Sequence, residues 1–159
     1  MLGVPRKLVI DPNPLEKTYH ELGRRIHPDR FASSPATVRD ASLRSTALLT
    51  RSYRTLRDPV SRGLYWLELN GEKLGENDKQ VAPEMAAMVF EVQEQLADLR
   101  TAGGDAAIEL RNEVERRRHE LGAAMDGMRG ELEKNFAAWD AGDGDRPQLT
   151  VELKTILSK

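Results

Sequence analysis

The apolar residues of this chain recur at the spacing of an α-helix in almost every segment, and this pattern constrains the fold more than any other feature. In the first such segment they lie three or four residues apart and share one helical face: Leu15, Tyr19, Leu22 and Ile26. No segment shows the alternation of polar and apolar residues that is typical of a half-buried strand. The pattern therefore predicts an all-α fold.

Proline, glycine and capping residues indicate where the predicted helices begin and end. Asp11 and Asn13 can cap the first helix, and Pro28 ends it because proline disfavours helical geometry at the residue before it. Ser34 is expected to cap a second helix that begins at Pro35 or Ala36. Similar signals set the remaining limits: the second helix extends to residue 57, a third covers 60–69, a fourth 83–100, a long fifth lies between turns at 101–105 and 142–147, and a last one covers 149–157.

These helices predict a division of the chain into two units. Residues 1–71 are expected to form a helical hairpin with a connecting helix, residues 72–80 a linker, and residues 81–159 a three-helix bundle. Residues 1–58 hold eleven Lys or Arg against six Asp or Glu, whereas residues 72–101 hold three against seven. We therefore expect a basic surface on the first unit and an acidic one on the second.

The composition excludes several classes of protein. Because the chain has no cysteine, it cannot hold a disulfide, a thiolate zinc site or a cysteine nucleophile. The net charge of −2 argues against a general nucleic-acid binder, and no apolar run is long enough to span a membrane. There is also no glycine-rich phosphate loop, no Ser/His/Asp pattern and no signal sequence. We therefore expect a cytoplasmic protein that is not an enzyme and has no cofactor.

His20 and His27 raise the question of a metal site, because they are two helical turns apart in the first predicted helix. A metal ion would need further ligands, and no other histidine is near them in sequence. We therefore expect no metal site.

A short motif, His27-Pro28-Asp29, follows the first predicted helix. The outer face of that helix is basic and includes Arg24 and Arg25, so the motif would lie at the exposed tip of an antiparallel hairpin. Pro28 limits backbone freedom, which reduces the entropy lost on binding. Asp29 can pair with an arginine of a partner, and His27 can fix the turn by a hydrogen bond. The alternative is an ordinary proline-stopped turn in which His27 caps the preceding helix.

A second candidate site lies on the fourth predicted helix. Its expected core face is apolar and consists of Met85, Met88, Val89, Val92, Leu96 and Leu99. The opposite face places Phe90 among alanine and carboxylate side chains: Ala87, Glu91, Glu94 and Asp98. An exposed aromatic ring surrounded by charge is a reasonable binding hot spot. Two alternatives are that Phe90 packs against the linker or the first unit, or that the face is merely solvated, which would leave Phe90 without a role.

Two segments resemble a known family. Residues 19–31, YHELGRRIHPDRF, resemble the second helix and loop of J-domains. Residues 52–71, SYRTLRDPVSRGLYWLELNG, resemble more narrowly the HscB family, the J-domain co-chaperones of iron–sulfur cluster biogenesis. In that family a TL-R-x-P helix end leads into an R-x-x-Y-x-L-x-x-x-G helix, and the matching positions here are Thr55, Leu56, Arg57, Pro59, Arg62, Tyr65, Leu67 and Gly71. The resemblance covers nearly the whole chain and is weaker beyond Gly71.

The resemblance implies a co-chaperone that stimulates the ATPase of a DnaK/HscA-type chaperone and delivers the scaffold protein IscU to it. Residues 1–71 would be the J-domain with its connecting helix, and residues 81–159 the scaffold-binding bundle. Contact with the ATPase would fall to the tripeptide and its basic surroundings: His27, Pro28, Asp29, Arg30, Tyr19, Arg24 and Arg25. The scaffold would bind the acidic helix face: Ala87, Phe90, Glu91, Glu94 and Asp98.

The chain also departs from the family pattern. Ala86 and Ala87 stand where larger apolar residues are commoner, which predicts a weaker or relocated apolar contact with the scaffold. Most of the short helix that begins HscB chains is absent before Gly3, and a late aromatic has no clear counterpart, with Leu149 or Leu153 as candidates for its place. Two alternatives therefore stay open: a J-domain protein for other clients, and a helical adaptor with no chaperone role.

Overall fold

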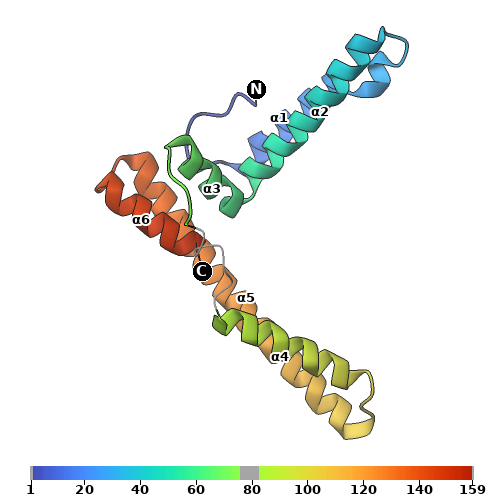
Figure 1. The fold of residues 1–159 in the computed structure, drawn as a ribbon, viewed down its shortest axis with the longest axis vertical. Coiled ribbons are helices and arrows are strands. Elements are labelled where there is room, and N and C mark those ends of the chain that lie inside the picture. The colour runs from blue at the N-terminus through green and yellow to red at the C-terminus, as the bar shows by residue number, and fades with distance from the viewer. Residues whose placement is uncertain (1, 76–82, 159) are drawn as a thin grey trace.

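The computed structural model describes residues 2–75 and 83–158, and within them every regular element is helical. One short 3-10 helix interrupts a series of six α-helices, in agreement with the all-α prediction (Figure 1). The elements are α1 (Pro12–Ile26), the 3-10 helix η1 (Pro28–Phe31), α2 (Ala36–Arg57), α3 (Pro59–Leu69), α4 (Pro83–Leu99), α5 (Gly104–Ala141) and α6 (Arg146–Leu157).

Two antiparallel hairpins extend away from a central region. The α1–α2 hairpin points in one direction, the hairpin of α4 with the first part of α5 points in another, and α3 and α6 lie between them (Figure 1). The two tips, at residues 27–35 and 100–103, are therefore at opposite ends of the molecule.

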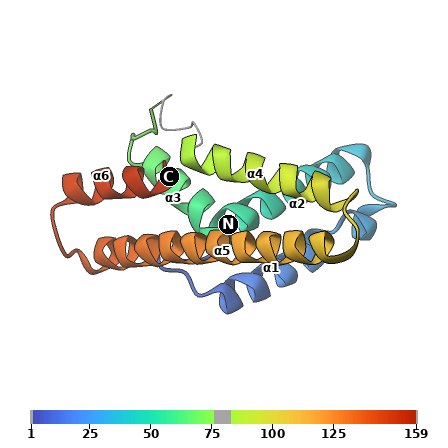
Figure 2. The same ribbon diagram turned by 90° about the horizontal axis from the view of Figure 1, so that it is seen from below.

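The three C-terminal helices form as expected, and the long α5 decides how they pack. At 1.5 Å per residue, the 38 residues of α5 span about 57 Å, whereas α4 and α6 have 17 and 12 residues. The two shorter helices lie one after the other along α5, α4 beside its first part and α6 beside its last (Figure 2). They therefore pack against different lengths of α5 rather than around one common core.

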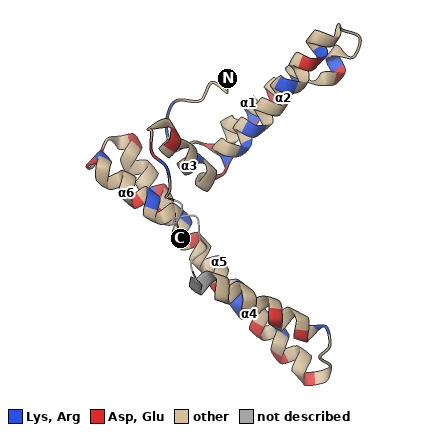
Figure 3. Ribbon diagram, viewed as in Figure 1, with Lys and Arg blue, Asp and Glu red and all other residues tan. Residues whose placement is uncertain are grey.

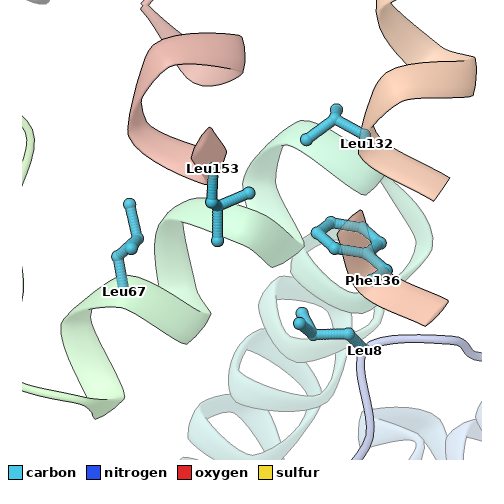
Figure 4. Packing of buried hydrophobic residues seen from close by; sticks show 5 residues of the cluster. All are labelled: Leu8, Leu67, Leu132, Phe136 and Leu153. Atoms are coloured by element: carbon cyan, nitrogen blue, oxygen red, sulfur yellow. The ribbon is translucent and has the colours of Figure 1, made fainter. Parts of the chain in front are cut away.

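The main core lies in the central region and joins four parts of the chain. Its buried residues come from the N-terminal segment, α3, α5 and α6: Leu8, Leu67, Leu132, Phe136 and Leu153 (Figure 4). The buried Gly63 of α3 allows a close approach, because a Cβ there would lie 3.2 Å from Leu157 Cδ1. Trp66 and Trp139 pack against this core in an edge-on pair, with ring centroids 5.8 Å apart. Two parts of the first predicted unit, at Leu8 and at Leu67, are thus packed against the second.

The α1–α2 hairpin has a core of its own. Leu15, Leu49 and Tyr53 are buried between the two helices, and Leu2 from the N-terminal segment covers them. The ring of Tyr19 stacks on that of Tyr53, with centroids 4.2 Å apart and planes 13° from parallel. The apolar stripe read from the sequence is therefore the packing face of α1.

The α4–α5 hairpin buries far less. Met88, Val92 and Leu99 face α5 and are half-buried, but Val89 and Leu96 are 45% and 43% exposed. Their assignment to the core was wrong, because α4 is covered mainly by one neighbouring helix, which shields only part of its circumference. The sixth residue of the expected core face, Met85, lies outside the described side chains.

The starts of α2 and α6 differ from the sequence expectation, whereas the cap expected for α1 forms. Pro35 rather than Ser34 precedes α2, and no side chain caps it. Pro147 lies in the first turn of α6 rather than in the preceding turn, which suits proline because the first helical N–H groups have no partner inside the helix. Asp11 does cap α1, and Asp58 caps α3 through a 2.7 Å bond from the Ser61 N–H.

The predicted linker, residues 72–80, is only partly described. Residues 76–80 lie outside the described residues. Glu72 contacts the last helix, because Lys154 Nζ donates a 2.6 Å hydrogen bond to its carboxylate. The first linker residue is therefore anchored to α6, and the domain limits drawn from the sequence remain predictions.

Candidate functional site

The His27-Pro28-Asp29 motif forms a defined turn at the tip of the α1–α2 hairpin. α1 ends at Ile26, His27 adopts an extended conformation with φ −59° and ψ 134°, and Pro28 begins the single turn η1. The Arg30 N–H donates to the His27 carbonyl across this turn at 3.1 Å. The segment between α1 and α2 is thus helical in its first part.

The imidazole of His27 orders the turn that follows it. Its Nδ1 accepts a 3.3 Å hydrogen bond from the Asp29 N–H and lies 3.3 Å from Asp29 Oδ2. The hydrogen bond from the Asp29 N–H needs an unprotonated Nδ1, whereas an ion pair with the Asp29 carboxylate needs a protonated one. Because the Asp29 side chain is 89% exposed, an ion pair there gains little, and the backbone contact is the ordering one. His27 therefore caps η1 with its side chain, and it also occupies the C-cap position of α1.

Two hydroxyl groups of α2 hold the end of α1. Ser42 Oγ and Thr46 Oγ1 both donate to the Ile26 carbonyl, at 2.6 Å and 3.3 Å. This carbonyl belongs to the last turn of α1, where carbonyls lack partners within the helix. Neither residue was predicted from the sequence. The signal that could have indicated them is a pair of hydroxyls one helical turn apart on the face of α2 that meets α1.

Basic side chains surround the turn. Arg24 and Arg25 occupy the last turn of α1, where a positive charge is favoured by the helix dipole, and both are exposed. Arg30 donates from Nη1 to the Arg24 carbonyl at 3.4 Å. Three predicted site residues thus lie in the same hairpin tip as Asp29, where the ribbon carries both basic and acidic positions (Figure 3). Tyr19, the remaining residue of the predicted chaperone-binding set, lies nearer the start of α1, with its ring in the hairpin core.

The outer face of α4 carries the second candidate site. Phe90 is 68% exposed, so the alternative in which it packs against the linker or the first unit does not hold for the described residues. Ala87, Glu94 and Asp98 are exposed on the same side, where acidic residues line α4 (Figure 3). Glu91 lies nearer the hairpin interface, 3.4 Å from Arg117 of α5. That arginine also lies between Glu113 and Glu120, so Glu91 has a role in joining the helices.

The exposed apolar residues of α4 extend this site beyond the sequence prediction. Val89 and Leu96 lie on the flank of Phe90 away from Glu94 and Asp98, as their 100° helical steps require. The face is therefore acidic on one side of Phe90 and apolar on the other. The spacing of apolar residues in the sequence cannot distinguish Val89 and Leu96 from core residues, because their exposure depends on how many helices cover α4.

The proposed replacements for a late aromatic residue do not reach the surface. Leu149 and Leu153 are buried in the α5–α6 packing, with Leu153 wholly inaccessible. Asn135 of α5 also donates a 3.1 Å hydrogen bond to the Leu149 carbonyl. Both residues hold α6 on α5, and their assignment to a binding site was wrong.

Two general features of the described residues bear on function. They contain no cluster of three or more potential metal ligands among His, Asp and Glu side chains. In the same part of the chain, no helix combines the length and apolar character that crossing a membrane requires.

The chain is similar to known proteins in both sequence and fold. It is 30% identical over 132 residues to co-chaperone protein HscB homologues of Paraburkholderia xenovorans and Burkholderia multivorans, covering 79% of this chain and 75% of each relative. No protein-family model matches it. Among solved structures it resembles human co-chaperone HscB, with a TM-score of 0.63 and 25% identity over 99% of this chain and 71% of that one. It also resembles HscB from Vibrio cholerae, with a TM-score of 0.65 and 20% identity over 98% and 85%.

Proposed function

Because the chain belongs to the HscB family of co-chaperones, which act in iron–sulfur cluster biogenesis, we propose that its two hairpins bind two different partners. The α1–α2 tip binds a DnaK/HscA-type chaperone and stimulates its ATPase. The outer face of α4 binds an IscU-type scaffold protein and brings it to that chaperone. A cytoplasmic location belongs to the same proposal.

The observation that carries the first half is the ordered turn at residues 27–30. His27, the turn of η1 and the hydroxyls of α2 fix the backbone, while the Asp29 carboxylate stays exposed at a tip that also carries Arg24, Arg25 and Arg30. A pre-ordered turn loses little entropy on binding, and an exposed carboxylate can make a charge-assisted bond with a partner arginine. The relatives are co-chaperones rather than enzymes, and this action needs no covalent chemistry by the chain itself. It biases a conformational equilibrium of the partner.

The second half is supported by the face of α4. Phe90 supplies an exposed aromatic anchor, and Glu94 and Asp98 select a partner surface that carries positive charge. Val89 and Leu96 supply the apolar contact that Ala86 and Ala87 are too small to make. Of the two expected outcomes, a weaker or a relocated apolar contact, this favours relocation.

The first test is ATP turnover by the cognate chaperone. Asp29→Asn keeps the shape of the side chain and removes its charge, so we expect stimulation to be lost while helicity is unchanged. Asp126→Asn makes the same change at an exposed position of α5 and should stimulate as the unmodified protein does. Full stimulation by Asp29→Asn would contradict the proposal.

The second test is scaffold binding by calorimetry. Phe90→Ala combined with Glu94→Lys should weaken binding strongly, and Val89→Ala with Leu96→Ala should weaken it to a smaller extent. Val151→Ala with Glu152→Lys is a matched control, because it removes an exposed apolar side chain and reverses one charge on α6. Unchanged binding by the first pair would exclude this face as the scaffold site.

The same assay separates the alternatives. A delivery protein should stimulate the ATPase more when scaffold is present than when either acts alone. A J-domain protein for other clients would stimulate without this synergy, and an adaptor with no chaperone role would not stimulate at all.

A further inference from the structure

The peptide group of Leu8 is held from both sides by charged side chains of the central region. The N–H groups of Leu8 and Val9 donate to the two carboxylate oxygens of Asp140, at 2.9 Å and 2.7 Å. The Leu8 carbonyl accepts from Arg62 Nη1 at 2.7 Å. Because Asp140 belongs to the end of α5 and Arg62 to α3, this short segment connects two helices of the core.

Arg62 also holds the joint between α2 and α3. Its Nε donates to the Leu56 carbonyl at 2.8 Å, and its Nη2 donates to the Arg57 carbonyl at 3.3 Å. The guanidinium lies over the ring of Phe136, 5.8 Å from its centroid. Burial lowers the pKa of Arg62, while Asp58, Asp140 and Glu133 oppose the shift, and an arginine stays charged under such conditions. Arg62 is the first residue of the R-x-x-Y signature, for which the sequence indicated no role.

These bonds act at the two places where the α1–α2 hairpin leaves the central region. One connection is the segment that precedes Pro12, which includes Leu8, and the other is the α2–α3 joint at Asp58. In the described residues the hairpin packs on α3 and has no extensive packing against α4, α5 or α6. Its orientation is therefore decided at these two connections, and Arg62 bonds to both of them.

We infer that Arg62 and Asp140 are positioning residues, which fix the angle between the α1–α2 hairpin and the α4–α5 hairpin through their bonds to the Leu8 segment. The inference about the angle stands independently of the proposed function. Its consequence, that scaffold bound on α4 is presented to the chaperone at a set angle from the His27 turn, rests on that function.

The angle can be measured directly because the chain has no cysteine that would interfere with labelling. Arg44→Cys on α2 and Met125→Cys on α5 provide two exposed positions for spin labels on the two hairpins. Pulsed electron paramagnetic resonance should give one narrow distribution of distances between the two labels for otherwise unmodified protein, and a broad one for Asp140→Ala. Asp126→Ala on the same helix should leave the distribution narrow.

Asp140→Asn provides a second variant in case the alanine variant fails to fold, as judged by circular dichroism. The asparagine side chain has a single acceptor oxygen for the two N–H groups, so an intermediate width is expected. A distribution as narrow as that of the unmodified protein in a folded Asp140→Ala, or in Asp140→Asn if the alanine variant does not fold, would overturn the inference.

Chaperone assays then test the consequence. Asp140→Ala leaves the His27 turn intact and should stimulate the ATPase alone as before, whereas the additional stimulation by scaffold should fall by roughly 2- to 30-fold, the range for residues that modulate coupling between sites. If a variant with a broadened distance distribution kept the full additional stimulation by scaffold, the angle between the hairpins would not matter for presenting scaffold to the chaperone, and this consequence would be wrong. If the unmodified protein did not stimulate at all, the proposed function would fail while the distance result kept its meaning.

Discussion

The two hairpins share a topology and differ in how they are held together. In the α1–α2 hairpin, Leu15, Leu49 and Tyr53 are buried, and the last carbonyl of α1 is bonded to hydroxyls of α2. In the α4–α5 hairpin the facing residues of α4 are only half-buried, and part of the contact is ionic, through Glu91 and Arg117. A hairpin that presents a short turn needs a packed interior to hold the turn in place. A hairpin that presents a long helix face must instead leave apolar surface uncovered.

This comparison predicts where the molecule is sensitive to mutation. The largest loss is expected in the central core, which anchors both hairpins. Phe136 is a buried ring that lies under the Arg62 guanidinium and beside Gly63 of α3. Phe136→Ala should therefore lower the free energy of unfolding by about 3–5 kcal/mol. Urea denaturation followed by circular dichroism measures this value. A loss below about 1 kcal/mol would show that the hairpins are stable without the shared core.

The next prediction compares the same substitution in the two hairpins. Leu49→Ala should cost about 2–5 kcal/mol because the side chain is fully buried between α1 and α2. Leu99→Ala removes the same atoms from a half-buried position of α4 and should cost about 1 kcal/mol. Both values come from the same denaturation experiment. Equal losses would contradict the difference in packing on which the comparison rests.

A smaller effect, of opposite sign, is expected within α5. Gly122 lies inside this helix, and a Cβ there would meet no atom within 4 Å. Gly122→Ala should therefore stabilise the protein by about 0.5–1 kcal/mol, because alanine loses less backbone entropy in a helix. The thermal midpoint reports the change, and Gly103→Ala, outside any helix, provides a control that should show no such gain. A lower thermal midpoint for Gly122→Ala would contradict the expectation that helix propensity contributes to stability in this part of α5.

The smallest effect concerns pH. A hydrogen bond from the Arg116 guanidinium lowers the pKa of Glu113 from its ordinary value of 4.5. A carboxyl group whose pKa is lowered on folding stabilises the folded state above its unfolded pKa, and this contribution disappears as pH falls through the folded pKa. Because the pair is on the surface, the difference between unmodified protein and Glu113→Gln should be slight at neutral pH and absent in acid. An acid titration of helicity for both proteins tests the sign, and a difference that grew in acid would contradict it.

Helix positions were largely predictable because they depend on local chemistry. Asp11 and Asp58 cap helices through bonds within three residues, and Pro28 ends α1 by its own ring. The turn at His27 was predicted for the same reason. The cap assigned to Ser34 was wrong, because Pro35 takes the position before α2 without a side-chain bond.

The tertiary structure decided which apolar side chains are covered. Val89 and Leu96 are spaced as core residues but are exposed, whereas Leu149 and Leu153, the candidates for the place of a late aromatic, are buried. Spacing shows which residues share a helix face, whereas exposure depends on whether another helix covers it. For α4 that cover is mainly α5, and for α6 it is α5 together with α3.

By itself, the sequence determined the all-α character and the six α-helices of residues 2–75 and 83–158, the basic turn at residues 27–30 and the acidic face around Phe90, because each depends on residues close together in the chain. Only the tertiary structure decided that α4 and α6 lie along different lengths of α5, and that Arg62 and Asp140 meet at Leu8. The Arg62 bond to the Leu8 carbonyl spans 54 residues and the Asp140 bond to the Leu8 N–H spans 132. Nothing in the spacing of a single chain predicts contacts over such separations, since they form only when packed helices bring their ends together.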